Sequence, residues 1–231
     1  MRRKRGRPVH GWLNLDKPAG LSSAQAVARA RRALDALKAG HAGTLDPFAT
    51  GVLPIAFGEA TKTMPYVAER TKTYRFTLRW GEARSTDDCE GEVTGESPVR
   101  PTRAAILAAL PAFRGEIRQI PPAYSAIKIR GERAYIRARA GESLVMPERG
   151  VSVQAFELVE QPDADHAVFS VTCGEGTYMR ALARDLALSL GTLGHLSALR
   201  RTAVGRFTEA TAISLEKLAE LGHSAAASPP L

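Results

Sequence analysis

Alternating polar and hydrophobic positions predict three strands. Residues 73–80 place an aromatic or aliphatic side chain at every second position, with Thr or Arg between, which is the pattern of a half-buried strand. Residues 167–173 alternate in the same way. The pattern over 151–159 changes phase between Ala155 and Phe156, which indicates a β-bulge in that strand.

Apolar residues at intervals of three and four predict three helices. A capping-box sequence at 22–25 begins the first, which we expect to continue until Gly40. Thr102 is expected to cap the second. The third follows a glycine-rich turn at 174–176 and ends at Gly191.

The order of these elements predicts the fold class and the domain organisation. Strands, including a short one expected over 11–16, mix with helices without regular βαβ alternation, which favours an α+β fold over a doubly wound one. We expect one domain over residues 10–221. A flexible basic arm over 1–9 is expected to precede it, and a disordered tail over 222–231 to follow it.

The positive net charge of the chain suggests a polyanionic partner. The chain has 231 residues, with 32 Lys and Arg against 24 Asp and Glu, so its formal charge is +8. Its composition excludes disordered and collagen-like classes, and no apolar run approaches the roughly 20 residues of a membrane span, so a cytoplasmic protein is expected. Basic residues, with Tyr124 and Tyr135 among them, gather over 114–139, which suits looped RNA or a solvated helix face equally. Cys89 and Cys173 are expected to be buried thiols.

Asp46 is the most informative acid, because it lies in a loop bounded by Gly and Pro rather than on a periodic polar face. A catalytic carboxylate and a turn-stabilising one both fit that position. His41 is a candidate base or metal ligand, or a stacking group, although one His and one Asp do not form a metal site.

Other candidate sites carry weaker signals. The turn before Tyr178 and Arg180 suits an anion at a helix N-terminus, but it lacks the third glycine of a dinucleotide fingerprint. Asp87 and Asp88 suit a carboxylate dyad or Mg²⁺, whereas adjacent acids in a polar loop are usually solvated. There is no Walker A sequence and no G-x-S-x-G elbow.

Five segments in order resemble the TruB family of tRNA pseudouridine synthases, and the resemblance extends over nearly all of residues 10–221. The most specific is GHAGTLDPFATGVLP at 40–54, which contains Asp46. The other four are GWLNLDKPAGLSS, KTYRF, IPPAYSAIKIRGERAY, and GTYMRALARDL with ALRR. The resemblance implies the pseudouridine synthase fold, a mixed and largely antiparallel sheet flanked by helices.

The resemblance also implies a reaction. The uracil of uridine 55 in the T-arm of tRNA is cut from its ribose, rotated and rejoined through carbon 5, with no cofactor and no metal. Asp46 matches the essential carboxylate, acting as nucleophile or base, and Arg180 matches the arginine that pairs with it. Tyr74 matches the aromatic residue stacked on the target base, which receives or relays the proton leaving carbon 5.

Further positions are assigned by the same resemblance. His41 would fill the space vacated by the flipped nucleotide, Tyr178 and Leu199 would line the pocket, and Asp88 would help to hold the substrate. Lys17 and Pro18 would support the catalytic loop. A basic insertion over about 114–145 would close over the T-loop, with Lys128 and Arg130 on phosphates.

Two departures and two alternatives accompany this hypothesis. Ile136 stands where the family commonly has an acid, and the C-terminal PUA domain common in bacterial members is expected to be absent. A monomer acting on tRNA without a protein partner is expected. The alternatives are a dyskerin-type synthase guided by a box H/ACA RNA, and a non-catalytic tRNA-binding or tRNA-folding protein.

Overall fold

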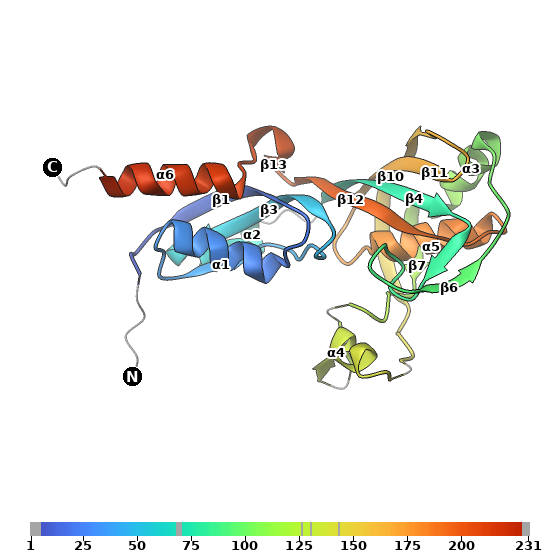
Figure 1. Cartoon of the computed structure of the whole chain (residues 1–231), viewed down its shortest axis with the longest axis horizontal. Coiled ribbons are helices and arrows are strands. Elements are labelled where there is room, and N and C mark those ends of the chain that lie inside the picture. The colour runs from blue at the N-terminus through green and yellow to red at the C-terminus, as the bar shows by residue number, and fades with distance from the viewer. Residues whose placement is uncertain (1–5, 68–70, 126, 130, 143, 228–231) are drawn as a thin grey trace. The chain divides into compact units, whose positions relative to one another are not determined.

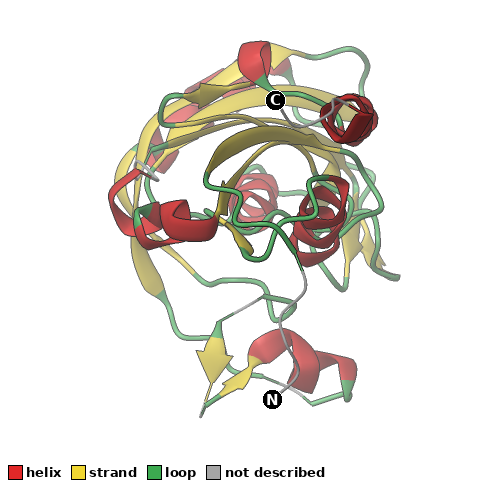
Figure 2. Ribbon diagram, turned by 90° about the vertical axis from the view of Figure 1, so that its left-hand side faces the viewer, coloured by secondary structure: helices red, strands yellow, loops and turns green. Residues whose placement is uncertain are grey.

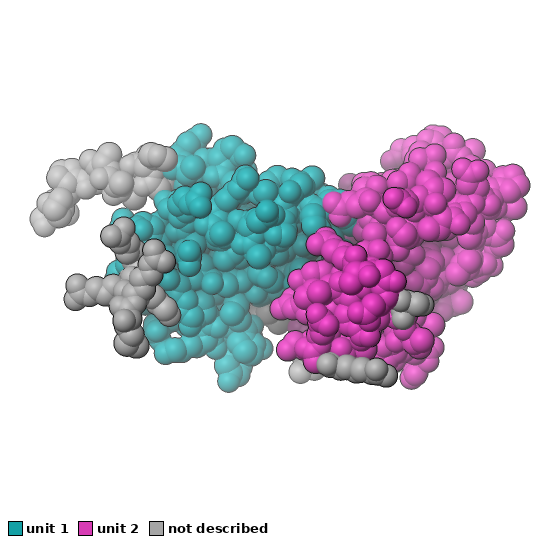
Figure 3. Space-filling model, turned by 60° about the horizontal axis from the view of Figure 1, so that its bottom comes forward, with its two compact units in different colours: residues 1–74, 200–231 teal, residues 75–199 magenta. Residues whose placement is uncertain are grey.

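The computed structural model describes residues 6–67, 71–125, 127–129, 131–142 and 144–227 of the chain (Figure 1). It divides into two compact units, residues 1–74 with 200–231 and residues 75–199, which Figure 3 distinguishes by colour. Two long strands, β4 (Lys72–Trp80) and β12 (Gly194–Val204), contribute residues to both units.

The first unit is built around β3 (Thr50–Phe57), whose residues are buried from Gly51 to Phe57. β1 pairs with it antiparallel, β12 pairs with it in parallel through Arg200 and Arg201, and β2 also pairs with it. Its other elements are β1 (Gly11–Lys17), α1 (Ser23–Ala33), β2 (Ala39–His41), the 3-10 helix η1 (Gly58–Lys62), α2 (Met64–Val67), β13 (Phe207–Thr208), η3 (Glu209–Thr211) and α6 (Leu215–Ala227).

Helix α1 begins as predicted and ends earlier. The Ser22 hydroxyl accepts a hydrogen bond from the Gln25 amide at 3.2 Å, and the Gln25 side chain accepts one from the Ser22 amide at 2.9 Å, which confirms the capping box. The predicted end at Gly40 is wrong. Asp35 adopts a φ of 46°, which no helix continues, and Gly40 lies in β2 opposite Ala56.

The second unit contains a sheet that begins with its own parts of β12 and β4. The next strands in the order of the sheet are β11 (His166–Cys173), β10 (Arg149–Glu160) and β7 (Gly115–Gln119). Two hairpins, β5 (Glu82–Arg84) with β6 (Val93–Glu96) and β8 (Lys128–Ile129) with β9 (Glu132–Arg133), lie outside that sheet. Its helices are α3 (Arg103–Ala109), η2 (Leu110–Phe113), α4 (Ala134–Arg139) and α5 (Met179–Ser189), drawn by type with the strands in Figure 2.

The hydrophobic faces predicted for these strands are confirmed. Phe76 and Trp80 of β4 are buried with Phe156 and Phe169 of the neighbouring strands, and Phe76 contacts both phenylalanine rings at centroid distances of 5.9 and 5.3 Å. The bulge in β10 is confirmed by a register shift between Val153 and Ala155. The Thr102 cap and the third helix are also present.

The fold class is confirmed as α+β with a mixed, mostly antiparallel sheet, but two finer expectations are wrong. α6 continues to Ala227, so residues 222–227 are helical rather than part of a disordered tail. Cys173 is buried but Cys89 is exposed, because it lies in the polar turn between β5 and β6. Within the described residues, no helix is long and apolar enough to cross a membrane.

Candidate active site

Asp46 lies in the loop between β2 and β3, which we call the Asp46 loop and define as residues 42–49. Its first residue is tied to β3 because the Ala42 amide donates to the Pro54 carbonyl at 3.0 Å. Leu45 is 4% exposed, and Asp46 next to it is partly exposed. Anchored on a buried neighbour, the carboxylate is held in place yet stays accessible, as a nucleophile or base requires.

Lys17, at the end of β1, reaches this loop. Its side chain is fully buried and donates to the carbonyl oxygens of Pro18 at 2.9 Å, Leu21 at 2.6 Å and Pro47 at 3.3 Å. Pro47 directly follows Asp46. The structure therefore connects Lys17 to the Asp46 loop, while Pro18 contributes a carbonyl that accepts from Lys17.

His41, the last residue of β2, enters the loop with a neutral ring. Burial lowers its pKa from the usual 6.5, and the nearby Arg201 guanidinium lowers that pKa further. Its Nδ1 atom is buried and has no hydrogen-bond partner among the described residues. A neutral ring with an unfilled hydrogen-bonding position suits contact with a nucleotide.

Arg180 lies in the first turn of α5, in the second unit. It is 5% exposed, forms an ion pair with Asp88 at 3.3 Å, and donates to the carbonyl oxygens of Thr86 at 3.0 Å and Tyr124 at 2.9 Å. The guanidinium is thus held between the turn that follows β5 and the segment that enters the basic insertion. Its pairing with Asp46 stays a prediction.

The adjacent acids of that turn are ion-paired, so the expectation that they are solvated is wrong. Asp88 is 2% exposed and accepts hydrogen bonds from the Thr86 hydroxyl and, at 3.1 Å, the Glu90 amide, besides pairing with Arg180. Asp87, at a φ of 59°, pairs with Arg184 at 2.9 Å. Burial raises the pKa of the Asp87 carboxyl, although Arg184 and Arg180 oppose that rise.

Tyr178 caps the start of α5, and its backbone is held by a side chain that sequence reasoning missed. The Gln119 carboxamide, 2% exposed, accepts from the Tyr178 amide at 3.1 Å and donates to the Tyr178 carbonyl at 3.3 Å. These partners are 59 positions apart, so no local pattern indicated them. Leu199 and Tyr74, at 8% exposed each, are nearly buried.

The basic insertion contains α4 and the β8–β9 hairpin, which stand away from the sheet of the second unit (Figure 1). Some of its cations are already paired: Arg137 with Glu142 at 2.6 Å, and Arg118 with Glu148 at 2.7 Å. Lys128 is exposed in β8. Arg130 lies outside the described residues.

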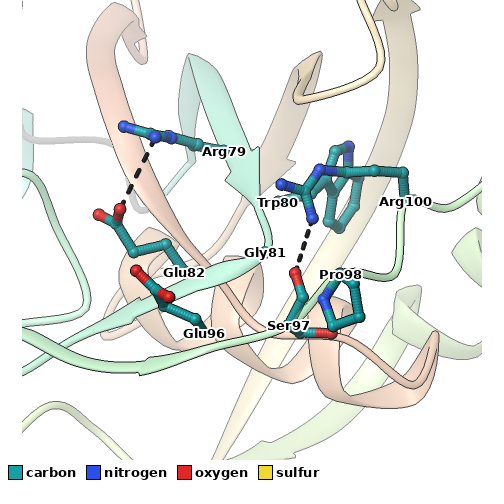
Figure 4. Close-up of a pocket in the computed structure, with 8 residues that line it drawn as sticks. All are labelled: Arg79, Trp80, Gly81, Glu82, Glu96, Ser97, Pro98 and Arg100. Carbon is teal, nitrogen blue, oxygen red and sulfur yellow. Dashed lines mark hydrogen bonds and ion pairs between the residues drawn. The ribbon is translucent and has the colours of Figure 1, made fainter.

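A pocket of about 410 Å³ in the second unit is lined by none of the predicted residues (Figure 4). Its walls mix charges, with Arg79 and Glu82 forming an ion pair at 3.7 Å. The lining is Arg79, Trp80, Gly81, Glu82, Glu96, Ser97, Pro98 and Arg100.

The two units divide the predicted residues between them. Those in the first unit are Lys17, Pro18, His41, Asp46 and Tyr74, and those in the second are Asp88, Lys128, Tyr178, Arg180 and Leu199. The structure brings Lys17 to the Asp46 loop and Asp88 to Arg180. Besides Gln119, sequence reasoning missed Ser23 and Arg201, which both bond to the Asp46 loop.

The solved structures to which the chain is similar include two of H/ACA complexes. The chain is 29% identical to one in the crystal structure of the archaeal box H/ACA sRNP Nop10-Cbf5 complex, with a TM-score of 0.69, covering 96% of this chain and 60% of that one. It is 28% identical, with a TM-score of 0.70, to one in the structure of an H/ACA RNP bound to a substrate RNA containing 2'-deoxyuridine, covering 95% and 59%.

Curated relatives are more similar. The tRNA pseudouridine synthase B of Gluconacetobacter diazotrophicus is 60% identical over 231 residues, covering 100% of this chain and 76% of that protein. That of Caulobacter vibrioides is 58% identical over 230 residues, covering 100% and 74%. The model for the N-terminal domain of TruB family pseudouridylate synthases matches residues 31–179, and the tRNA pseudouridylate synthase B C-terminal domain matches 180–228. The chain belongs to the TruB family of pseudouridylate synthases.

Proposed function

We propose that this protein converts uridine 55 in the T-arm of tRNA to pseudouridine. The proposal is supported by family membership along the chain and by the names of its curated relatives, which are tRNA pseudouridine synthases. The observation that carries it is the Asp46 loop: a partly exposed carboxylate follows a buried residue, in a segment held by buried side chains from elsewhere in the first unit.

The reaction is an isomerisation that balances without a co-reactant. The bond between ribose C1′ and uracil N1 breaks, the uracil turns, and a bond forms between C1′ and C5. The hydrogen of C5 leaves as a proton and N1 gains one, so no electrons are transferred. In this proposal the Asp46 carboxylate acts as nucleophile at the ribose or as base, while Tyr74 stacks on the base and receives or relays the C5 proton.

The proposed reaction needs an ionised carboxylate at Asp46. A guanidinium beside a carboxylate favours its charged form, and we assign that role to Arg180, whose Nη1 and Nη2 donate to the Thr86 and Tyr124 carbonyls. In this proposal Asp88 helps to hold the substrate by fixing Arg180, with which it pairs at 3.3 Å.

Access to the target requires base flipping, which costs a few kcal/mol of lost stacking. We propose that His41 fills the space left by the flipped nucleotide, for which its neutral ring is suited. Tyr178 and Leu199 line the pocket. The basic insertion closes over the T-loop, with Lys128 and Arg130 on phosphates.

Tritium release from T-arm RNA carrying [5-³H]uridine tests the proposal. Wild-type protein should release tritium, and Asp46→Asn should reduce release below detection while still binding the RNA. Asp163→Asn is the matched control, because this carboxylate is 55% exposed and pairs only with surface groups, so its activity should equal that of wild type. An active Asp46→Asn protein would contradict the assigned role.

Substrate choice is tested with two transcripts. The greater similarity to relatives named for tRNA than to box H/ACA proteins favours free tRNA as substrate. A tRNA transcript without any guide RNA should therefore be modified, and the same transcript with cytidine at position 55 should not. A requirement for guide RNA would favour the dyskerin-type alternative, and tRNA annealing that persists in Asp46→Asn would indicate a second, non-catalytic activity.

A further inference from the structure

Arg201 is a fully buried cation whose side-chain hydrogen bonds end on backbone oxygens around the Asp46 loop. From β12, its Nε donates to the Val52 carbonyl at 2.8 Å, Nη1 to the Thr44 carbonyl at 3.3 Å and Nη2 to the Gly43 carbonyl at 3.1 Å. The planar guanidinium therefore spans from β3 to the loop. All four residues belong to the first unit.

The backbone of Arg201 is fixed as closely as its side chain. Arg201 pairs with Gly51 of β3, which has a φ of +101°, and a Cβ at Gly51 would lie 2.2 Å from the Arg201 carbonyl oxygen. Because the two strands approach so closely at Gly51, the backbone of Arg201 has little freedom to move. The fixed backbone of β12 therefore limits where the Arg201 guanidinium can lie relative to the loop.

Arg201 is one of three side chains that form hydrogen bonds with the backbone of the loop. The Ser23 hydroxyl accepts from the Leu45 amide at 2.7 Å and donates to the Leu45 carbonyl at 2.9 Å, and Lys17 donates to the Pro47 carbonyl. The Asp46 carbonyl accepts from the Ala49 amide at 3.2 Å. Every carbonyl from Gly43 to Pro47 thus accepts a hydrogen bond.

The charge of Arg201 also acts on the loop. No carboxylate of the described residues forms an ion pair with this guanidinium, although burying a charge is costly unless it is well bonded. The carbonyls satisfy its donors but do not cancel its charge. Arg201 accordingly lowers the pKa of His41, the residue that directly precedes the loop.

We propose that Arg201 is a positioning residue for catalysis: its two terminal nitrogens, which we call the fork, hold the Gly43–Thr44 turn so that Asp46 is presented to the ribose. This inference rests on the proposed function. Because small misplacements of a reacting group reduce rates strongly, loss of the fork should lower kcat roughly 10- to 100-fold while leaving KM within about twofold.

Arg200 provides a matched control, since it is the preceding residue of the same strand and carries the same charge. Its guanidinium instead pairs with Asp16 at 2.9 and 3.0 Å and with Glu209 at 2.9 Å, and it is 35% exposed. Tritium release should be measured for Arg201→Lys, Arg201→Met and Arg200→Lys. We expect the kcat of Arg200→Lys to equal that of wild type and the kcat of both Arg201 variants to fall.

The two variants separate the fork from the charge. Arg201→Lys keeps the charge and loses the fork, whereas Arg201→Met loses both. A similar fall in kcat in the two variants would therefore identify the fork as the group that positions the loop. A merely structural role would lower the amount of folded protein without lowering the kcat of the protein that folds. If Arg201→Met does not fold, the kcat and KM of Arg201→Lys alone test the positioning role.

Hydrogen exchange of the peptide covering 42–49 gives a readout that needs no activity. The amides of Ala42, Leu45 and Ala49 are hydrogen-bonded, and they should exchange faster in Arg201→Lys than in Arg200→Lys. Unchanged exchange, or an unchanged kcat in folded Arg201 variants, would overturn the inference. Absence of tritium release by wild-type protein would instead overturn the proposed function, and exchange would still test the positioning of the loop.

Discussion

Lys17 and Arg201 are both fully buried, and each donates to three backbone carbonyl oxygens. A carbonyl cluster can satisfy a buried cation, and removing the cation takes a donor away from each member of the cluster. The two side chains approach the Asp46 loop from different strands. At the scale of single residues, the loop owes its shape to side chains outside it.

Lys17→Met should lower the free energy of unfolding by about 3 kcal/mol, because the Pro18 and Leu21 carbonyls lose the lysine donor and Pro47 keeps only the Gly20 amide. Lys62→Met serves as the control, since that side chain is 70% exposed and its loss should change stability by less than about 0.5 kcal/mol. Urea unfolding followed by circular dichroism measures both. Equal midpoints for the two variants would show that the Lys17 bonds contribute nothing.

His195 makes stability depend on pH. It is 2% exposed, its Nδ1–H donates to the Glu82 carbonyl at 2.9 Å, and burial holds its pKa below the usual 6.5. As the pH falls through 6.5, this histidine becomes protonated in the unfolded chain but stays neutral in the folded protein. The free energy of unfolding therefore decreases below this pH. Between pH 7.5 and 5.5, wild-type protein should lose more free energy of unfolding than His195→Gln. Parallel losses in both proteins would contradict this assignment.

Sequence reasoning found Asp46 but missed Ser23 and Arg201, two of the side chains that hold its loop. Gly and Pro on both sides of Asp46 mark a loop, and this signal is local. Ser23 bonds to Leu45 across 22 positions and Arg201 to Gly43 across 158, so neither partnership leaves a local signal. The resemblance supplied the roles of Arg180 and Tyr74, which no spacing indicated.

At the scale of elements, alternation predicted strands well where only apolar side chains are buried. β4, β11 and the bulged β10 were found in this way. β12 was missed because its buried positions include His195 and Arg201, which a binary pattern scores as exposed. The end of α1 was misplaced because apolar residues continue at helical spacing past Asp35, where the backbone leaves the helix.

Gly51→Ala should disrupt the pairing of β3 with β12. The new Cβ would lie 2.2 Å from the Arg201 carbonyl oxygen, so the strands must separate, and we expect a loss of about 3 kcal/mol or more in stability. Gly115→Ala is the control: its φ is also positive, at +82°, but nothing lies within 4 Å of the added atom. It should cost only about 1 kcal/mol. Thermal unfolding compares them, and similar losses would mean that backbone strain alone explains the effect.

At the scale of the whole molecule, the net charge of +8 understates how unevenly cations are used. Lys17, Arg180 and Arg201 are buried and serve the fold or the site. Arg118 and Arg137 are neutralised by glutamates. The net charge therefore indicated a polyanionic partner, but the structure is needed to identify which exposed cations are available to bind it.

The β8–β9 hairpin carries such cations. Lys128 and Arg133 are exposed and stand directly opposite each other in the register of this two-stranded sheet. Like charges in this position repel, and a phosphate between them would relieve the repulsion, so folding and RNA binding favour each other here. The hairpin belongs to the segment that the resemblance assigned to RNA, and this charge arrangement is an independent reason for that assignment.

Lys128→Ala should reduce the salt dependence of RNA binding. Removing one lysine–phosphate ion pair lowers the slope of log Kd against log salt concentration by about 0.7 to 0.9, because fewer counterions are released on binding. Lys62→Ala removes the same charge from a residue paired with Glu59 in the other unit, and its slope should equal that of wild type. Titrations of T-arm RNA between about 50 and 200 mM salt give the slopes. If both variants shift the slope equally, net charge rather than the hairpin attracts the RNA, and the insertion is not its contact surface.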